Sequence, residues 1–247
     1  MAVLSAQAAP ALDHFHREGW DIVQPVSLAY DADLCALWVA QERPELVLVT
    51  PSGRELRRFD TGFSRVRAVT VEGDTVIAGD GWGTFQRYDR HGRAIGGTFT
   101  PPAGMRDIEG VHLDPDGTMF FVGDDPAFVV ALSPDGLETL RIDGETLEPP
   151  LREPQGIARD PVSGNLLVID DNEGLNAIFE MTAAGELLSV TPLSDWGRDA
   201  EAVALQPQTG QMFIGFDWSQ RVEVFDWLPT RSSIPDEMDL GPPCPVS

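Results

Sequence analysis

The chain has 247 residues, of which 42% are hydrophobic, enough for a packed core and too many for a disordered chain. Seventeen Lys and Arg side chains against 40 Asp and Glu give a formal net charge of −23, which excludes nucleic acid and anionic lipid surfaces as partners, because both bind to basic patches. No apolar run reaches the ~18–20 residues of a membrane-spanning helix, so no membrane span is predicted.

The N-terminal residues lack the basic region and apolar stretch of a signal peptide. They do contain a small-residue pattern, residues 6–8, that is typical of a cleavage site. Export and a cytoplasmic location therefore both stay open. The two cysteines, Cys35 and Cys244, form no metal-binding spacing. They predict no disulfide framework and leave a single bridge open.

A short strand pattern recurs about every 40–45 residues, which is the repeat length of a propeller blade. The five copies of this opener lie at 27–29, 68–70, 110–112, 156–158 and 202–204. After each opener come a polar turn, an apolar run and then an alternating strand; the apolar runs are 37–40, 76–79, 119–122, 166–169 and 212–215. Four copies continue through a glycine turn into a fourth strand. Short strands joined by such turns are typical of antiparallel hairpins.

We therefore predict an all-β fold, a β-propeller of five four-stranded blades that forms a single domain over residues 1–247. The fifth copy lacks its fourth strand, and the N-terminal segment 1–23 is expected to supply it, with residues 226–247 as a Pro-rich tail. Closing the ring in this way removes open sheet edges. A sixth, degenerate blade built from both ends of the chain is one alternative, and a β-sandwich or barrel is another.

The residues just before the openers are expected to converge at one mouth of the channel, because the first strand of each blade is innermost. They are Val26, Arg67, Glu109, Gln155 and Glu201. A second polar group follows the second strands and should lie at the same mouth; it includes Glu42, Asp125, Asp171, Asn172 and Asp217. Carboxylate and amide oxygens are the ligands that Ca²⁺ requires, about 6–8 in number.

These residues predict a Ca²⁺ or other divalent-cation site whose candidate ligands are Glu109, Glu201, Asp125, Asp171 and Asn172. The alternative is that the acids cap turns and pair with nearby arginines such as Arg65 and Arg67. For binding a small-molecule or carbohydrate-like ligand at this mouth, the candidates are Trp82, Trp218, Arg67 and Gln155. Packing between blades is the alternative for the tryptophans.

His112 follows Glu109 on an inner strand, and it is either a general base near the channel or a histidine of the core. The chain contains no nucleophile elbow, phosphate loop, HExxH or dinucleotide fingerprint. The candidate catalytic residues are therefore Glu109, Glu201 and His112.

Three openers carry a recognisable pattern, at residues 107–111, 153–161 and 199–204. They resemble the D-x-E-G-[IV]-A openers of the SdiA-regulated family and of the esterase-like-activity-of-phytase domain. Residues 156–188 also resemble NHL-repeat blades, and the gluconolactonase/senescence-marker propellers share a similar Glu-Gly opener.

In the lactonase-like families, a Glu at the opener and Asn or Asp residues on other blades hold a catalytic metal. The resemblance implies Glu109 as the first ligand, with Glu201, Asp171 or Asn172 as others. Two positions depart from this pattern, Arg67 on the second blade and Gln155 on the fourth. The first hypothesis is a divalent-cation-dependent hydrolase of the lactonase, esterase or phosphoesterase type. The second is a non-catalytic propeller that binds a ligand or protein at its mouth.

Overall fold

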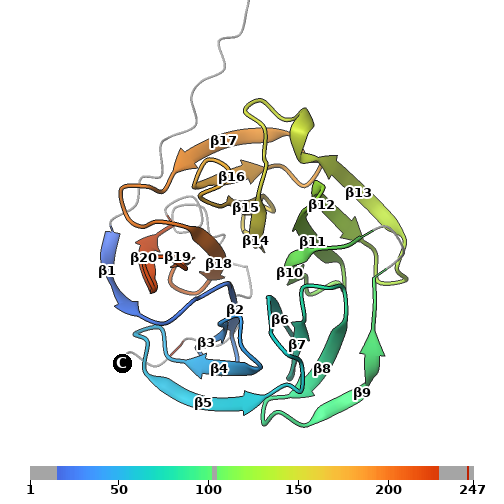
Figure 1. Ribbon diagram of the computed structural model, residues 1–247, viewed down its shortest axis with the longest axis vertical. Coiled ribbons are helices and arrows are strands. Elements are labelled where there is room, and N and C mark those ends of the chain that lie inside the picture. Colours follow the sequence, from blue (N-terminus) through green and yellow to red (C-terminus); the bar gives the residue numbers. More distant parts are fainter. Residues whose placement is uncertain (1–15, 102–104, 228–243, 245–247) are drawn as a thin grey trace, which may run out of the picture.

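The computed structural model describes residues 16–101, 105–227 and 244. In this part of the chain, five four-stranded antiparallel sheets are arranged as the blades of a ring (Figure 1). A 3₁₀ turn, η1 (Gly144–Thr146), is the helical element among these residues. The predicted five-bladed propeller is thus confirmed, and the six-bladed and sandwich alternatives are wrong.

The strands of each blade follow one another from the channel outward. Blade 1 is β2 (Ser27–Asp31), β3 (Ala36–Ala40), β4 (Glu45–Val49) and β5 (Glu55–Asp60). Blade 2 is β6 (Ala68–Glu72), β7 (Thr75–Gly79), β8 (Phe85–Asp89) and β9 (Ala94–Phe99). Blade 3 is β10 (Ile108–Leu113), β11 (Met119–Asp124), β12 (Ala127–Leu132) and β13 (Glu138–Asp143). Blade 4 is β14 (Pro154–Arg159), β15 (Leu166–Asp170), β16 (Ala177–Met181) and β17 (Leu187–Pro192). Blade 5 is β18 (Ala200–Gln206), β19 (Gln211–Phe216), β20 (Arg221–Asp226) and β1 (His16–Asp21).

The burial of each strand reflects its place in the blade. The second strands, such as β3 and β15, are buried on both faces because neighbouring blades cover them. The outermost strands β5 and β9 are largely exposed. The hydrophobic core therefore lies between adjacent sheets; one cluster, for example, joins Phe120 and Val122 of blade 3 to Ile157 and Val168 of blade 4.

Glycine turns join the third and fourth strands, as the repeat predicts. The turn glycines Gly53, Gly92, Gly136 and Gly185 all have φ between 80° and 88°, a conformation that side chains with a Cβ atom rarely adopt. These turns therefore fix the length of each outer hairpin.

The ring closes between blades 5 and 1. Strand β1 pairs antiparallel with β20, and Arg17 donates two hydrogen bonds to the Asp226 carboxylate, at 3.0 and 3.1 Å. The N-terminal segment thus supplies the missing strand, as predicted.

A single disulfide joins Cys35, in the turn after β2, to Cys244, with Cα atoms 5.5 Å apart and 209 residues between them in sequence. This is the bridge that the sequence left open. The rest of the tail from residue 228 onward lies outside the described residues. Among the described residues, no helix is long and apolar enough to cross a membrane.

Candidate functional site

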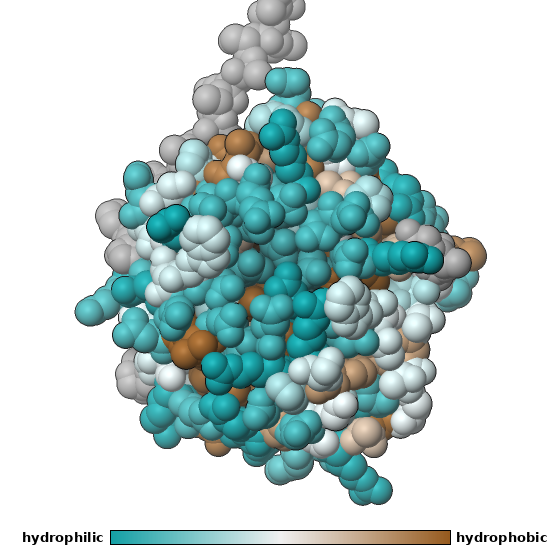
Figure 2. All heavy atoms as spheres, viewed as in Figure 1, coloured by the Kyte–Doolittle hydropathy of each residue, from teal (hydrophilic) through white to brown (hydrophobic). Residues whose placement is uncertain are grey.

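The five inner strands β2, β6, β10, β14 and β18 all run in the same direction along the channel, because each begins a blade with the same topology. We call the mouth at which they begin the acidic mouth and the other the opposite mouth. Figure 2 shows hydrophilic side chains gathered over the centre of the ring on the face in view. Both polar groups predicted from the sequence meet at the acidic mouth, since Gln155 contacts Asp124 and Asp171 from the ends of β11 and β15.

β-Bulges direct the carboxylates of Glu109 and Glu201 toward the channel. In β10 the strand register shifts between Ile108 and Gly110, which leaves Glu109 as the extra residue. The same shift between Ala200 and Ala202 in β18 involves Glu201. A bulge turns the inserted side chain away from the regular alternation of the strand. This is why two acidic side chains point from buried inner strands into the mouth.

The glycines that follow Glu109 and Gln155 have a steric reason. A Cβ atom on Gly110 would lie 2.3 Å from the carbonyl oxygen of Gln155, and one on Gly156 would lie 2.6 Å from that of Glu201. The inner strand of one blade therefore packs directly against the opener of the next. The Glu-Gly and Gln-Gly pattern thus reflects blade packing as well as the chemistry of the mouth.

Arg67 lies at the centre of a polar network that joins four blades. Its guanidinium forms an ion pair with Glu109 on blade 3 and donates to Gln155 Oε1 on blade 4 at 3.3 Å. On blade 1, Glu42 lies 3.5 Å from Arg67 and 3.1 Å from Arg65. Burial opposes the charge of Arg67, but Glu109 and Glu201 raise its pKa above the ordinary value. Arg67 is therefore a structural cation that neutralises part of the mouth.

A second group, on blades 4 and 5, forms no ion pair with an arginine within the described ranges, and Arg67 acts on its Glu201 and Asp199 only through electrostatic attraction. Carboxylate oxygens of Asp171, Asp199 and Glu201 lie within 4.8 Å of one another, and all three residues are buried. The Oε2 atom of Glu201 is buried without a hydrogen-bond partner. We call these three residues the carboxylate group. An unpaired carboxylate oxygen in a buried position is unfavourable unless something compensates it.

Hydrogen bonds from backbone N–H groups and from one side-chain amide hold the carboxylate group in place. The Glu173 N–H donates to Asp171 Oδ1 at 2.7 Å, and Gln155 Nε2 lies 3.4 Å from Asp171 Oδ2. Asp199 has φ +66° and accepts a bond from the Asn172 backbone. The left-handed conformation of Asp199 folds the chain back so that Asp199 and Glu201 face the same point.

The pKa values at the acidic mouth reflect this crowding of negative charge. Burial, and then the charge of Asp199, raise the pKa of Asp171 to about 6. Burial, followed by the charges of Asp171 and Asp124, raises the pKa of Glu153 to about 7. Burial also raises the pKa of Glu201 well above its ordinary value, against the effect of Arg67. The mouth therefore carries more negative charge than its arginines compensate.

Two exposed tryptophans flank the mouth. Trp82 is 65% exposed and Trp218 is 56% exposed, so neither serves the packing between blades. Each is stacked by an arginine, Arg65 at 4.3 Å from the Trp82 ring centroid and Arg198 at 4.9 Å from that of Trp218. Both rings stand beside the acids on loops that follow second strands.

The structure brings together most of the predicted residues but not all. Arg67, Glu109, Gln155, Asp171 and Glu201 meet as expected.

Two predicted ligands lie differently. Asp125 is exposed, and its neighbour Asp124 is the residue that reaches Gln155, at 3.5 Å. Asn172 contributes its backbone N–H to Asp199. The proposed roles of Asp125 and Asn172 as ligands stay predictions.

His112 lies apart from the two glutamates. It lines a cavity at the opposite mouth and bonds Asp114. Conversely, Asp199 belongs to the carboxylate group although it was not among the candidate ligands. Its place in the D-x-E opener was the signal available in the sequence.

No protein-family model matches the chain, and no curated protein matches it either. Solved structures with a similar fold include Myxococcus xanthus glutaminyl cyclase, at TM-score 0.66 and 11% identity, covering 86% of this chain and 96% of the other. A Bacteroides caccae protein of unknown function matches at TM-score 0.53 and 12% identity, covering 76% and 69%. A chain of the mitotic checkpoint complex matches at TM-score 0.52 and 10% identity, covering 81% and 60%. Likeness at these identities shows the fold alone.

Proposed function

We propose that the protein is a divalent-cation-binding propeller, and that the carboxylate group of Asp171, Asp199 and Glu201 holds the cation. The observation that carries the proposal is the buried, unpartnered Oε2 atom of Glu201 beside two further carboxylates. A divalent cation would compensate this charge. Ca²⁺ suits the donors best, because it takes oxygen ligands in flexible geometry. Three carboxylates supply part of its shell and leave positions for a ligand.

The cation would serve to bind an organic ligand at the acidic mouth. Exposed aromatic rings next to polar groups are typical of carbohydrate and small-molecule sites, and Trp82 and Trp218 stand in this position. Hydroxyl groups of a carbohydrate-like ligand could complete the coordination of the cation. Glu109 already forms an ion pair with Arg67 and is therefore less suited to act as a catalytic base. A binding module is thus the primary form of this proposal.

A metal-dependent hydrolase of the lactonase or esterase type is the second candidate. It is favoured by Glu153, which directly precedes β14 and lies next to the carboxylate group, since its backbone carbonyl accepts a hydrogen bond from the Asp171 N–H at 3.1 Å. Among the described residues, no ion pair engages Glu153. A carboxylate free of arginine beside a cation site can act as a general base, whereas the Arg67 ion pair makes Glu109 less suited to that role.

The first experiment measures thermal unfolding of the oxidised protein with Ca²⁺ or with chelator. A specific site is expected to stabilise the protein by about 2.7 kcal/mol at a Ca²⁺ concentration 100-fold above the Kd. In Glu201→Gln this stabilisation should be lost. The metal-free variant should at the same time be more stable than the wild type, because a neutral amide replaces a buried carboxylate.

The matched control is Glu173→Gln, an exposed acid next to the carboxylate group, which should keep the Ca²⁺ response. If the wild type shows no response to Ca²⁺, Mg²⁺ or Mn²⁺, or if Glu201→Gln responds as the wild type does, the cation proposal is wrong.

The hydrolase candidate is tested by the hydrolysis of a γ-lactone and of p-nitrophenyl esters with and without Ca²⁺. Turnover that requires Ca²⁺ and falls by 100-fold or more in Glu153→Gln, in line with general-base catalysis, would support a hydrolase. Ca²⁺ binding without Ca²⁺-dependent turnover on any of these substrates would contradict the hydrolase candidate and support the binding module.

A further inference from the structure

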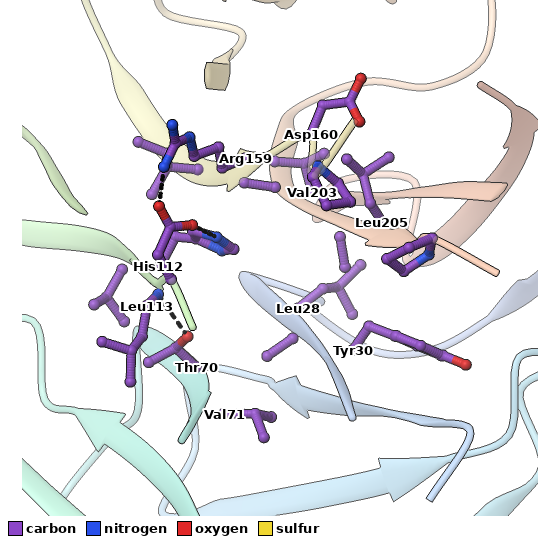
Figure 3. A pocket seen from close by; sticks show the side chains of 18 of the residues that line it. Leu28, Tyr30, Thr70, Val71, His112, Leu113, Arg159, Asp160, Val203 and Leu205 are labelled. Carbon is purple, nitrogen blue, oxygen red and sulfur yellow. Dashed lines mark hydrogen bonds and ion pairs between the residues drawn. The ribbon is translucent and has the colours of Figure 1, made fainter. Parts of the chain in front are cut away.

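A cavity of about 510 Å³ lies at the opposite mouth, away from the carboxylate group. Its walls are the final residues of all five inner strands. The aliphatic side chains among them include Leu28, Val71, Leu113, Ile157, Val203 and Leu205. Figure 3 shows His112 and Arg159 on one side of this space and Leu28, Val203 and Leu205 on the other. Cavities of this size and apolar character are typical of small-molecule sites.

A fixed polar group interrupts the apolar wall. His112 Nε2 lies 3.2 Å from Asp114 Oδ1, and the other oxygen of Asp114 forms an ion pair with Arg159. Arg159 is itself held by the Gly164 carbonyl at 3.0 Å. Burial opposes the charge of Asp114, but the bond with His112 and the charge of Arg159 lower its pKa. Asp114 is therefore an ionised acceptor.

The ionised state of Asp114 determines what His112 offers to the cavity. A carboxylate can only accept, so Nε2 must carry the hydrogen of this bond. In the neutral ring, Nδ1 is then an acceptor. His112 is partly exposed and lines the cavity. With its ring neutral, His112 thus presents the Nδ1 acceptor next to aliphatic side chains of the wall, which favours a ligand that combines a hydrogen-bond donor with an apolar body.

The net charge of the cavity lining favours some hydrogen-bond donors over others. Asp114, Asp116 and Asp160 line the cavity with one arginine, Arg159, so the lining is net negative. An anionic ligand would be repelled, whereas an ammonium group would be attracted. Tyr30, which also lines the cavity, has its pKa raised to about 12 by burial and by the charge of Asp31. It therefore stays neutral and adds no negative charge.

We propose that this cavity is a second ligand site, which binds a small amine with a compact apolar body, the amine donating to His112 Nδ1. The site is separate from the carboxylate group and does not depend on the proposed cation. It assigns to His112 a binding role at the opposite mouth in place of the catalytic role beside the glutamates that the sequence suggested.

The experiment is a calorimetric titration with three probes that share an indole ring, namely tryptamine, tryptophol and indole-3-acetate. Chelator and about 150 mM salt suppress non-specific attraction to the acidic surface. We expect tryptamine to bind tightest, tryptophol at least fivefold more weakly and indole-3-acetate not measurably. His112→Phe keeps an aromatic ring without the acceptor, and it should weaken the binding of tryptamine at least tenfold.

Two variants keep the result interpretable. Val71→Trp, at a half-buried position of the cavity wall, should also abolish tryptamine binding by filling the space. Glu201→Gln, at the acidic mouth, should leave it unchanged. The proposal is overturned if no probe binds, if tryptamine and indole-3-acetate bind equally, if a folded His112→Phe or Val71→Trp binds like the wild type, or if Glu201→Gln abolishes binding.

Discussion

Replacing Arg67 with methionine is expected to destabilise the metal-free protein by roughly 3–5 kcal/mol, the usual effect of removing one partner of a buried ion pair. Glu109 is 5% exposed and pairs with Arg67, so its charge would remain in the mouth without a counterion. The loss also removes the bond to Gln155, which links blades 2 and 4. The measurement is the free energy of unfolding from denaturant titration with chelator present.

Two further variants distinguish the ion pair from a general effect of the substitution. Adding Glu109→Gln to Arg67→Met should recover a large part of the lost stability, because the uncompensated charge is then gone. Arg65→Met should lower the free energy of unfolding by less than about 1 kcal/mol, since Arg65 and its partner Glu42 are more exposed. Equal losses in Arg65→Met and Arg67→Met would contradict the role of Arg67 as the central cation.

The fold of this chain could be predicted from its sequence because its determinants are local. Each blade repeats an apolar strand, a polar turn and a glycine that adopts positive φ, as at Gly92 and Gly185. The missing fourth strand of the last copy predicted that the N-terminal segment would close the ring, and β1 does so. These signals depend on neighbours a few residues apart, which a single sequence displays directly.

The site could be predicted only in part, because its details depend on packing. Glu109 and Glu201 were identified from their place before an inner strand, but the bulges that aim them are visible only in the strand register. Of the adjacent Asp124 and Asp125, only Asp124 contacts Gln155, and a shift of one residue reverses which face a side chain takes.

His112 and the cysteines show two further limits. His112 is three residues beyond Glu109 on β10, about 10 Å along the strand at roughly 3.3 Å per residue, so it belongs to the opposite mouth. Cys35 and Cys244 are 209 residues apart, and no spacing rule connects cysteines at that distance.

The disulfide joins the C-terminal end of the chain to blade 1, one of the two blades at the junction that β1 closes. Cys35 lies in the turn after β2 of blade 1, and Tyr30 of that strand contacts Cys244 Sγ through its hydroxyl at 2.8 Å. The bridge therefore ties the C-terminal end to the first blade, while β1 ties the N-terminal segment to the last. Because separating blades 5 and 1 would open the ring, we expect both links to oppose that opening.

We expect the double variant Cys35→Ser, Cys244→Ser to unfold with a free energy about 2–4 kcal/mol lower than that of the oxidised wild type, mainly because the unfolded chain is no longer constrained by a long loop. Denaturant titrations of both proteins with and without reductant provide the measurement. Reductant should lower the free energy of unfolding of the wild type to that of the variant and leave that of the variant unchanged. If the oxidised wild type and the variant are equally stable, the bridge does not contribute to ring closure.

Arg17→Met removes the ion pair between β1 and Asp226. We expect it to lower the free energy of unfolding of the double cysteine variant by more than that of the oxidised wild type. In the double variant the disulfide is absent, so the second link across the junction no longer holds the ring.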